Sequence, residues 1–526
     1  MITVSNNAFA SVSTLFSDLA KIIVGEIDCS LQTLEQYATD GSPYMVRPQA
    51  VIYPKNATDI KHVLSFAREY TMPVVARGNG SGRLGGALSE GIVLDMTRYF
   101  DRIRHINMLD QTITVDAGVT VKTLRDRLHG WNVDIPVLTA ENNSQTVGSL
   151  VATKGISASA FHFGTIRDWI EAVTLVVDTG EEHTISDGVT PSGRLLGIYQ
   201  AVFPTLSVEG PILRASKPES SDDATGYSIW NTSIGPRQLL DQLVGSEGTL
   251  GIITSITFRL IPKRVHESTV CIPIKDKKDL VTYSDIAKQH KAEHVYMYDA
   301  TFMELVDRYH LNRIPQFPDA NYALLVTFYG DDVEKIRAHV RTYVRSLRID
   351  ESTLVYYDDK HFVDRTTDRD FLFSLLTSYT KDAYIPIVSA GGLVVPIHNY
   401  VDTLLKVEDY LYSTGKLYVI TGCVASGHIS VVTLFDPQSK SFDGDIENYM
   451  QSLAGIVKKS KGGISARGGE GLSKTPYIPY IFNEATLEVF KKIKQAWDPL
   501  HILNPGKKIS ITKQYLREHI QRKSAL

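Results

Sequence analysis

The sequence predicts an α+β protein with more than one domain. At 526 residues the chain is too long for one hydrophobic core, and chains of this length divide into two or three domains. A glycine-rich stretch, PVVARGNGSGRLGGALSEGIVLDM (residues 73–96), connects two short apolar segments that are typical of strands. After Pro262, strands and helices alternate without another glycine fingerprint, which indicates an α+β region with an antiparallel sheet.

The glycine-rich stretch carries six glycines between residues 78 and 91, and each of them costs conformational entropy on folding. Gly80, Gly82 and Gly85 match the G-x-G-x-x-G dinucleotide fingerprint, but that fingerprint requires a helix directly after the loop. Here the residues GALSEG and then a second strand, IVLDM, follow instead. The loop therefore favours a nest of backbone N–H groups around a pyrophosphate. A flexible surface loop is the alternative.

The other elements of the first half follow from periodicity. Residues 50–78 read as strand, helix and strand, with Thr58 as the expected N-cap of the helix. KTLRDRLHGW (122–131) predicts a short amphipathic helix. Residues 138–169 are small, polar and weakly periodic, and a long segment of this kind within a domain is usually functional. EAVTLVVDTGEEHTIS predicts a hairpin with its turn at Asp178–Gly180.

The second half alternates between strands and helices. A second glycine-rich segment, VGSEGTLGIITSITFRLIP (244–262), ends in a strand. YALLVTFYG and DVEKIRAHVRTYVRSL (322–347) predict a strand followed by a helix, as do LVVPI and YVDTLLKVEDYLY (393–412). The segment LEVFKKIKQAWDPLHILNPGK (487–507) predicts a helix followed by a turn.

Composition narrows the function class. The formal net charge of −4 gives no basic surplus, which argues against nucleic acid as the main partner. Cys29, Cys271 and Cys423 lie far apart without a C-x-x-C pair, so neither a disulfide framework nor a zinc module is indicated. Reduced thiols fit a cytoplasmic location. No stretch approaches the roughly 18 apolar residues of a membrane span.

The two ends of the sequence are amphipathic. MITVSNNAFASVSTLFSDLAKIIVGEI lacks the basic start and apolar block of a signal peptide and is typical of a helix instead. TKQYLREHIQRKSAL is basic, and a solvated terminal helix is its simplest interpretation. A weak contact of this tail with a membrane surface is the alternative.

Several of these segments, in this order, resemble a known family. VVARGNGSGRLGGAL, TVGSLVATKG, FHFGTIRDWIEAVTLVVDTGE, VGSEGTLGIITSITFRLIP and DPLHILNPGKKI are similar to segments of the FAD-linked oxidases of the vanillyl-alcohol-oxidase superfamily. The resemblance extends over residues 37–508, and the branch of the glycolate oxidases and D-lactate dehydrogenases is the most similar. It implies an α+β fold: a PCMH-type FAD-binding domain of two α/β subdomains plus an α+β cap domain with an antiparallel sheet.

The resemblance also implies domain boundaries. They are an N-terminal helical segment (1–45), the PCMH-type FAD-binding domain (46–263), a substrate or cap domain (264–480), a C-terminal return to the FAD domain (481–510) and a basic tail (511–526).

By resemblance, the glycine loop cradles the FAD pyrophosphate and three later segments complete the cofactor site. The implied cofactor-binding residues are Arg77, Gly78, Asn79, Gly80, Ser81, Gly82, Leu84, Gly85, Thr146, Gly148, Ser149, Ala152, Gly164, Thr165, Glu247, Gly248, Ile252 and Asn504. Some relatives attach FAD covalently through a histidine in this loop, where Ser81 stands here. No cysteine lies between Cys29 and Cys271 to form a second kind of link, so we expect FAD to bind non-covalently.

The metal and acid-binding segments of the family are altered. Relatives read G-H-x-x-D-G-N-x-H where this chain reads GCVASGHIS, and E-H-G-x-G-x-x-K where it reads RGGEGLSK. The family's substrate arginine is also missing from DFLFSLLTSYTK. We therefore expect no metal. A rebuilt site from Cys423, His428 and Glu470 is the alternative, although it lacks a recognised ligand spacing.

The catalytic candidates are Arg467, His428, His398 and Lys474. Arg467 would bind an anionic substrate, because a guanidinium holds a carboxylate with two hydrogen bonds. His428 or His398 would act as the base, and Lys474 is retained from the family motif. A structural role is the alternative for each histidine.

The sequence thus predicts an FAD-dependent oxidoreductase that takes hydride from a CH–OH group to flavin N5, with a 2-hydroxy acid or a related small polar molecule as substrate. The electron acceptor is not predicted. One alternative is an FAD-binding scaffold or partner subunit with a degenerate active site, which the lost family residues favour. A nicotinamide-dependent Rossmann enzyme is another, favoured by the G-S-G-R-L-G stretch alone.

Overall fold

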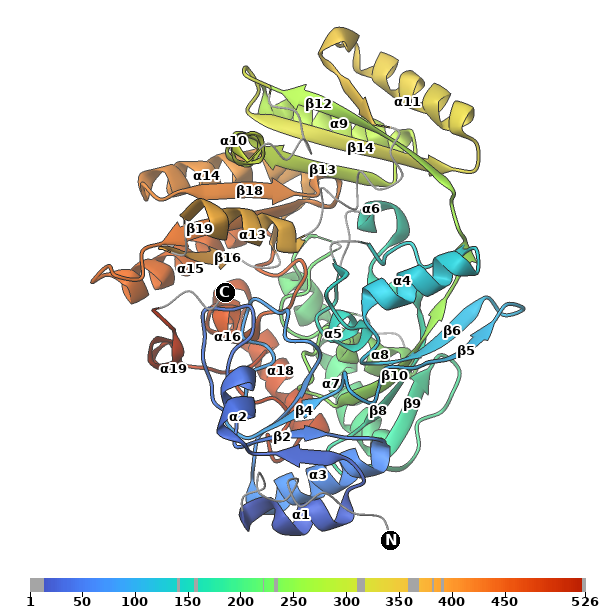
Figure 1. Ribbon diagram of the computed structural model, residues 1–526, viewed down its shortest axis with the longest axis vertical. Coiled ribbons are helices and arrows are strands. Elements are labelled where there is room, and N and C mark those ends of the chain that lie inside the picture. The colour runs from blue at the N-terminus through green and yellow to red at the C-terminus, as the bar shows by residue number, and fades with distance from the viewer. Residues whose placement is uncertain are drawn as a thin grey trace.

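The structure is a computed structural model, shown in Figure 1. It describes residues 14–139, 142–155, 159–220, 222–230, 235–309, 317–357, 369–380, 383–388 and 392–522. Two small sheets occupy the lower part of Figure 1 and a larger sheet lies above them. The predicted α+β class is confirmed.

The first sheet has four strands in the order β1-β2-β4-β3, of which β2, β4 and β3 are parallel. The strands are β1 (Glu26–Asp28), β2 (Ala50–Tyr53), β3 (Val74–Arg77) and β4 (Ile92–Asp95). The helices around it are η1 (Thr14–Phe16), α1 (Ser17–Ile22), α2 (Leu31–Tyr37) and α3 (Ala57–Tyr70). The predicted cap of α3 was wrong: Asn56 caps it, accepting a hydrogen bond from Asp59 N at 3.0 Å. Thr58 lies inside the first turn.

The glycine loop is the crossover between β3 and β4. Parallel neighbours need a connection of a dozen or more residues, and a helix usually provides it. Here residues 78–91 provide it without a helix, as the sequence predicted. The loop therefore begins at the carboxyl end of β3.

The second sheet is antiparallel, with the order β5-β6-β10-β8-β9. Its strands are β5 (Ile103–Asn107), β6 (Thr112–Asp116), β8 (Ile170–Val176), β9 (Glu182–Ser186) and β10 (Ile252–Arg259), and a short pair joins β7 (Val133–Asp134) to β11 (Ile261–Pro262). Its helices are α4 (Val121–Gly130), α5 (Val147–Ala152), α6 (Ala160–Phe163), η3 (Ile166–Trp169), α7 (Gly193–Ser216) and α8 (Arg237–Leu243). The predicted β8–β9 hairpin is confirmed.

The cap sheet runs in the order β15-β12-β14-β13-β18-β19-β16, with β17 beside β19, and every pairing in it is antiparallel. Its strands are β12 (His266–Ile274), β13 (His294–Asp299), β14 (Tyr322–Gly330), β15 (Val355–Tyr357), β16 (Ile385–Val388), β17 (Leu393–Val394), β18 (Tyr418–Gly422) and β19 (His428–Phe435). Its helices are α9 (Lys277–Gln289), α10 (Ala300–Arg308), α11 (Val333–Leu347), η4 (Glu351–Thr353), α13 (Arg369–Thr380), η5 (Ile397–Asn399), α14 (Tyr400–Ser413), η6 (Val424–Ser426) and α15 (Phe442–Lys459).

The chain then returns to the first sheet. The returning elements are α16 (Gly471–Lys474), η7 (Thr475–Tyr477), α17 (Ile478–Ile481), α18 (Glu484–Trp497) and α19 (Lys513–His519). Helix α18 packs on α7, and the turn after it runs beside β3. There Val74 N donates to Ile502 O at 2.7 Å, and Asn504 N donates to Val74 O at 2.8 Å. The C-terminal turn is thereby held next to the glycine loop.

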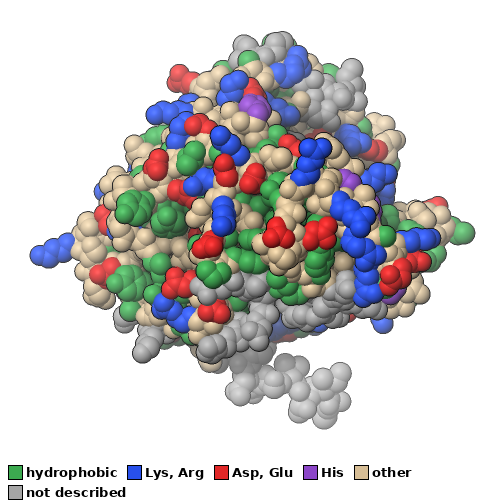
Figure 2. Space-filling view, turned by 90° about the horizontal axis from the view of Figure 1, so that it is seen from above, with side chains coloured by type: hydrophobic (Ala, Val, Ile, Leu, Met, Phe, Trp, Pro, Cys, Tyr) green, Lys and Arg blue, Asp and Glu red, His purple; other side chains and the backbone are tan. Residues whose placement is uncertain are grey.

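The surface carries both signs of charge. Figure 2 shows Lys and Arg interspersed with Asp and Glu over the cap end, with hydrophobic side chains between them. Over the residues that the structure describes, no helix has the length and apolar character needed to cross a membrane.

Candidate active site

One cavity lies between the glycine loop and the cap sheet. Its lower wall comes from residues 76–84, Gly86 and Ala87, from α5 and the residues beside it, and from the second glycine-rich segment around Gly248. Its upper wall comes from β13, β16, β18, β19, α10 and α13, and Arg467 lines it as well. The cavity therefore brings together three segments that the sequence assigned to a cofactor and one residue that it assigned to a substrate.

Two glycines of the loop are required by the packing of the protein itself. A Cβ atom added at Gly78 would lie 2.5 Å from Thr146 Oγ1. Gly80 has a φ of +72°, and a Cβ there would lie 2.3 Å from an Arg77 guanidinium nitrogen. The side chain of Asn79 donates a hydrogen bond to Ser144 O, which ties the loop to the segment before α5.

Gly82 is different, because nothing in the described protein requires a glycine there. Its φ lies outside the left-handed region, and the nearest atom to an added Cβ would be Asp40 Oδ2 at 3.9 Å. A glycine with open space beside it on a cavity wall leaves room for a ligand to approach the backbone closely. The residues present therefore fit a bound cofactor at this position.

Two buried amides strengthen that fit. Asn142 and Gln145 line the cavity and are 6% and 7% exposed. Within the described part of the chain, Asn142 Nδ2 and Gln145 Oε1 have no hydrogen-bond partner. Buried polar atoms are rarely left unsatisfied, so these two are suited to a polar ligand. The sequence interpretation missed both, although they directly precede the TVGSL motif.

Arg77 lines the cavity, but its guanidinium binds mainly to groups of the protein itself. Its guanidinium donates to Tyr37 O at 3.1 Å and to Thr39 O at 2.8 Å, and lies 5.0 Å from the centre of the Tyr37 ring. Burial lowers the pKa of Arg77 from its usual value. The arginine therefore fixes the glycine loop on the segment after α2.

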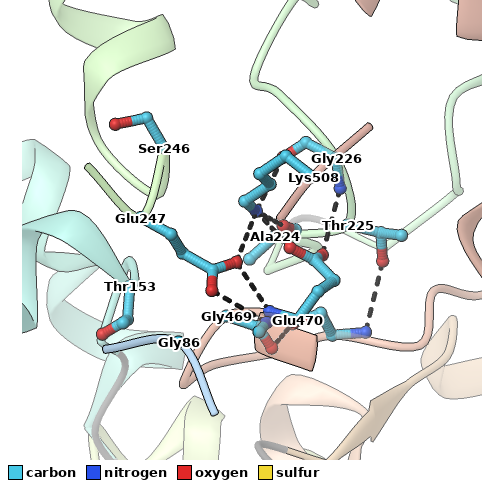
Figure 3. Close-up of polar contacts among 12 residues, drawn as sticks. Gly86, Thr153, Ala224, Thr225, Gly226, Ser246, Glu247, Gly469, Glu470 and Lys508 are labelled. Atoms are coloured by element: carbon cyan, nitrogen blue, oxygen red, sulfur yellow. Dashed lines mark hydrogen bonds and ion pairs between the residues drawn. The ribbon is translucent and has the colours of Figure 1, made fainter. Parts of the chain in front are cut away.

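A buried charge cluster joins the second glycine-rich segment to the cap and the C-terminal return (Figure 3). The Glu247 carboxylate accepts from Glu470 N at 2.7 Å and from Gly471 N at 2.8 Å. Lys508 forms an ion pair with Glu470 and lies 3.5 Å from Glu247. All three side chains are at most 3% exposed. Burial opposes the charge of Lys508, but the two carboxylates outweigh it and raise its pKa.

Asn504 completes this junction instead of lining the cavity. Its side-chain amide donates to Gly86 O at 2.9 Å and to Glu247 O at 2.7 Å. One side chain therefore connects the end of the glycine loop with the second glycine-rich segment. Lys474 is also outside the cavity lining: it is buried and donates to Ile464 O, and burial lowers its pKa to about 7.

The structure separates four further predicted cofactor residues from the cavity wall. Gly85 packs on Leu472 and Ile252 lies in the core of the first sheet. Gly164 and Thr165 line a second cavity instead. Thr165 N also donates to Asp168 Oδ2 at 2.8 Å in a capping box. The predicted residues that do line the cavity are Arg77, Gly78, Asn79, Gly80, Ser81, Gly82, Leu84, Thr146, Gly148, Ser149, Ala152, Glu247 and Gly248.

The cap wall is mainly aromatic and aliphatic. Tyr296, Tyr298, Phe302, Leu372, Phe373, Val388 and Val432 line it, with Thr421 and Ser430 between them. Arg467 Nη2 donates to the Tyr296 hydroxyl at 3.3 Å, and that hydroxyl lies 3.3 Å from Thr421 Oγ1. Sequence reasoning missed the two tyrosines, because HVYMYD reads as an ordinary strand.

Neither predicted histidine lines the cavity. His428 begins β19 on the same face as Ser430 and Val432, but Gly392 covers its ring: a Cβ added to Gly392 would lie 1.8 Å from His428 Nε2. The side chain of His398 is 66% exposed and lies 3.9 Å from Glu219. Alternation along β19 gives the face on which His428 lies but not what covers it, and nothing in the sequence places His398 at the surface.

The alternative of a rebuilt metal site is not supported. Across the described ranges, no group of three or more His, Cys, Asp and Glu side chains is arranged to hold a metal ion. Glu470, one of the three candidate ligands, is held by Lys508 and by Gly226 N.

Comparison with known proteins agrees with this geometry. The FAD binding domain family matches residues 48–186, and the C-terminal domain family of the FAD linked oxidases matches residues 266–508. The chain belongs to the FAD-linked oxidases. The predicted family and its FAD cofactor are thereby confirmed.

Curated relatives of this FAD-linked oxidase are distant. The chain is 23% identical over 511 residues to a D-2-hydroxyglutarate dehydrogenase of Pseudomonas putida, covering 92% of the chain and 50% of that relative. It is 24% identical to an Archaeoglobus fulgidus D-lactate dehydrogenase, covering 90% of the chain and 95% of the relative. It is 24% identical to the glycolate oxidase subunit GlcD of Bacillus subtilis, covering 90% of the chain and 91% of that relative. The chain thus spans about half the length of the first curated relatives it matches.

A solved structure shares the fold. An alkyldihydroxyacetonephosphate synthase superposes with a TM-score of 0.64 over 94% of this chain and 84% of that one, at 14% sequence identity. At this identity the likeness concerns the fold alone.

Proposed function

We propose that the protein is an FAD-dependent oxidoreductase that oxidises the CH–OH group of a 2-hydroxy acid or a related small polar substrate. The observation that carries the proposal is the cavity whose walls hold both the glycine loop and Arg467. Relatives named D-lactate dehydrogenase, glycolate oxidase subunit and D-2-hydroxyglutarate dehydrogenase support the same class.

The glycine loop, the start of α5 and the Glu247–Gly248 turn would hold FAD. Gly82 would allow the closest approach, and Asn142 and Gln145 would offer an amide donor and acceptor. Ser81 carries no imidazole for a covalent link, which supports non-covalent binding.

The family matches also bear on the domain boundaries. Their starts at residues 48 and 266 and the end at residue 508 support proposed boundaries near residues 45, 263 and 510. The boundary at residue 480, within the second match, stays a prediction.

Bound FAD would supply the hydride acceptor, at N5 of its isoalloxazine. The residues of the cap wall would do the rest of the chemistry. Arg467 would bind the substrate carboxylate, because a guanidinium offers two parallel donors. Tyr296 would be the residue that exchanges the substrate hydroxyl proton, because its hydroxyl lies beside Arg467 in the cavity wall, and the predicted histidine bases do not line the cavity.

The test is the visible absorbance of the FAD-loaded full chain under anaerobic conditions, with D- and L-2-hydroxy acids added one at a time. We expect one of them to bleach the flavin, and Arg467→Ala to slow the bleaching about 100-fold or more through loss of the carboxylate clamp. Arg337→Ala, on the outer helix α11, is the matched control and should bleach like the wild type. Failure of every hydroxy acid to bleach a fully bound flavin would contradict the proposal.

A specific observation favours a second function, that of an FAD-binding partner subunit or scaffold. The family's metal-binding histidines and glutamate are replaced by Cys423, Ser430 and Arg467. This function predicts tight FAD binding with no bleaching by any hydroxy substrate, so the same titration separates the two.

For the basic C-terminal segment, packing against the rest of its own chain is better supported than contact with a membrane. Leu516 packs with Tyr44, Leu88 and Leu472. Arg517 forms an ion pair with Glu447. The cytoplasmic location stays a prediction.

A further inference from the structure

We infer that the substrate carries a bulky apolar group, an aryl or branched alkyl chain, next to its single carboxylate. This inference rests on the proposed function and concerns the part of the substrate that faces the cap wall. It departs from the small or dicarboxylic acids that appear in the names of the relatives.

The cap wall forms a continuous aromatic row. The ring centres of Tyr296 and Tyr298 are 5.1 Å apart, and Tyr298 stacks on Phe302 at 4.5 Å with an interplanar angle of 23°. All three side chains line the cavity. Rings at these distances fix one another, so the wall is a preformed apolar surface.

The rest of the cap wall is mainly apolar. Leu372 and Phe373 of α13, Val388 of β16 and Val432 of β19 line the same space. A substrate group held between these side chains and the aromatic row is removed from water. An aryl or branched alkyl group gains from that transfer, whereas a hydroxyl, amine or second carboxylate loses hydrogen bonds to water.

The charges of the described lining residues point the same way. Arg467 is the one cation among those contributed by the cap and the segment after it. Arg83 comes from the glycine loop, and its guanidinium lies 3.5 Å over the ring of Phe373. One carboxylate therefore has a partner beside Tyr296. Arg83 stacks on the ring of Phe373, and the other polar groups that the cap contributes to the described lining are the hydroxyl groups of Thr421, Ser430 and the tyrosines.

Two measurements on the FAD-loaded full chain test this inference. The first is anaerobic flavin bleaching by both enantiomers of lactate, 2-hydroxyglutarate and 3-phenyllactate. The second is calorimetric titration with phenylacetate, acetate and glutarate, which cannot be oxidised at a CH–OH group. We expect kcat/KM for one 3-phenyllactate enantiomer to exceed that for lactate about tenfold or more. We also expect the affinity for phenylacetate to exceed that for acetate about tenfold or more.

The outcomes separate this inference from the proposed function. A preference for lactate or 2-hydroxyglutarate would overturn the inference and leave the oxidoreductase standing. No bleaching together with selective phenylacetate binding would overturn the oxidoreductase and support the apolar site. Equal binding of phenylacetate and acetate would overturn the inference whatever the flavin does.

Variants of the wall sharpen the result. Phe373→Ala should raise KM for 3-phenyllactate about tenfold and leave that for lactate nearly unchanged. If Phe373→Ala folds poorly, Val388→Phe can replace it. This change narrows the space without removing a core contact, and it should also raise KM for 3-phenyllactate more than KM for lactate. Tyr412→Ala is the control, because that aromatic ring is 84% exposed on α14 and away from the cavity. Equal effects on both substrates would contradict an apolar subsite.

Discussion

The glycine loop and the cap wall face each other across one cavity, but different properties of the chain build them. The loop is shaped by backbone: missing Cβ atoms at Gly78, Gly80 and Gly82, and carbonyls that hold Arg77 in place. The cap wall is shaped by side chains that reach the cavity from strands and helices far apart in the sequence. The difference teaches that a site made of backbone is visible in a local motif, whereas a site made of side chains depends on the sheet that assembles it.

The largest effect should come from the cluster that joins the two regions. Lys508→Met would leave Glu247 and Glu470 buried without their cation, which costs about 3–5 kcal/mol of unfolding free energy. Denaturant unfolding of the FAD-free protein measures it. Lys491→Met, on the exposed face of α18, should change stability little. An unchanged stability of the Lys508 variant would mean that the two regions are not held together by this cluster.

The glycine loop alone is tested by Gly82→Val. Because an added Cβ atom would meet no protein atom closely, we expect the FAD-free protein to unfold at nearly the same temperature. FAD affinity should fall about 100-fold, since the side chain would occupy space that the ligand needs. Flavin fluorescence titration measures the affinity, and Gly130→Ala, also in open space but on α4, is the control. Wild-type affinity in the valine variant would show that FAD does not approach this glycine.

The buried Lys474 below the cap predicts a pH dependence of stability. Burial lowers its pKa to about 7, from 10.5 when unfolded. Between these values the unfolded chain binds more protons than the folded one, so this group makes stability rise with pH, by about 1.4 kcal/mol per unit. Unfolding free energies of wild type and Lys474→Met from pH 7 to 9 measure the difference. Parallel curves for the two proteins would show that Lys474 keeps an ordinary pKa.

The smallest effect distinguishes charge from geometry at the cap wall. Arg467→Lys keeps the positive charge but loses the planar pair of donors. We expect KM for the hydroxy acid to rise about tenfold while FAD affinity stays at the wild-type value. Steady-state kinetics with the best substrate of the panel measures the change. A wild-type KM would indicate that any cation suffices, and an equal loss of FAD affinity would place Arg467 at the cofactor instead.

The sequence singled out much of the lower cavity wall because its signals are local. The glycine loop, the N-cap Thr146 and the Glu247–Gly248 turn each lie within a short motif, and all reach the cavity. The same reasoning missed Asn142 and Gln145, whose importance lies in being buried without a partner among the described residues. No composition or spacing rule reveals that property, because burial belongs to the folded chain.

The cap half was predicted less well, for a related reason. Arg467 does reach the cavity, but His428 lies under Gly392 and His398 lies at the surface, while Tyr296 and Tyr298 form the wall. The sequence showed that the family's metal ligands were replaced. It did not indicate which of the remaining side chains line the cavity.

By itself, the sequence determined the α+β class, the family, the FAD cofactor and the glycine loop between two strands, because these depend on periodicity and on residues close together in the chain. Tertiary structure alone decided that Lys508 meets Glu247 and Glu470, and that an aromatic row faces Arg467. Most of those contacts join residues far apart in the sequence. Their distances follow from how the sheets pack, which no single segment encodes.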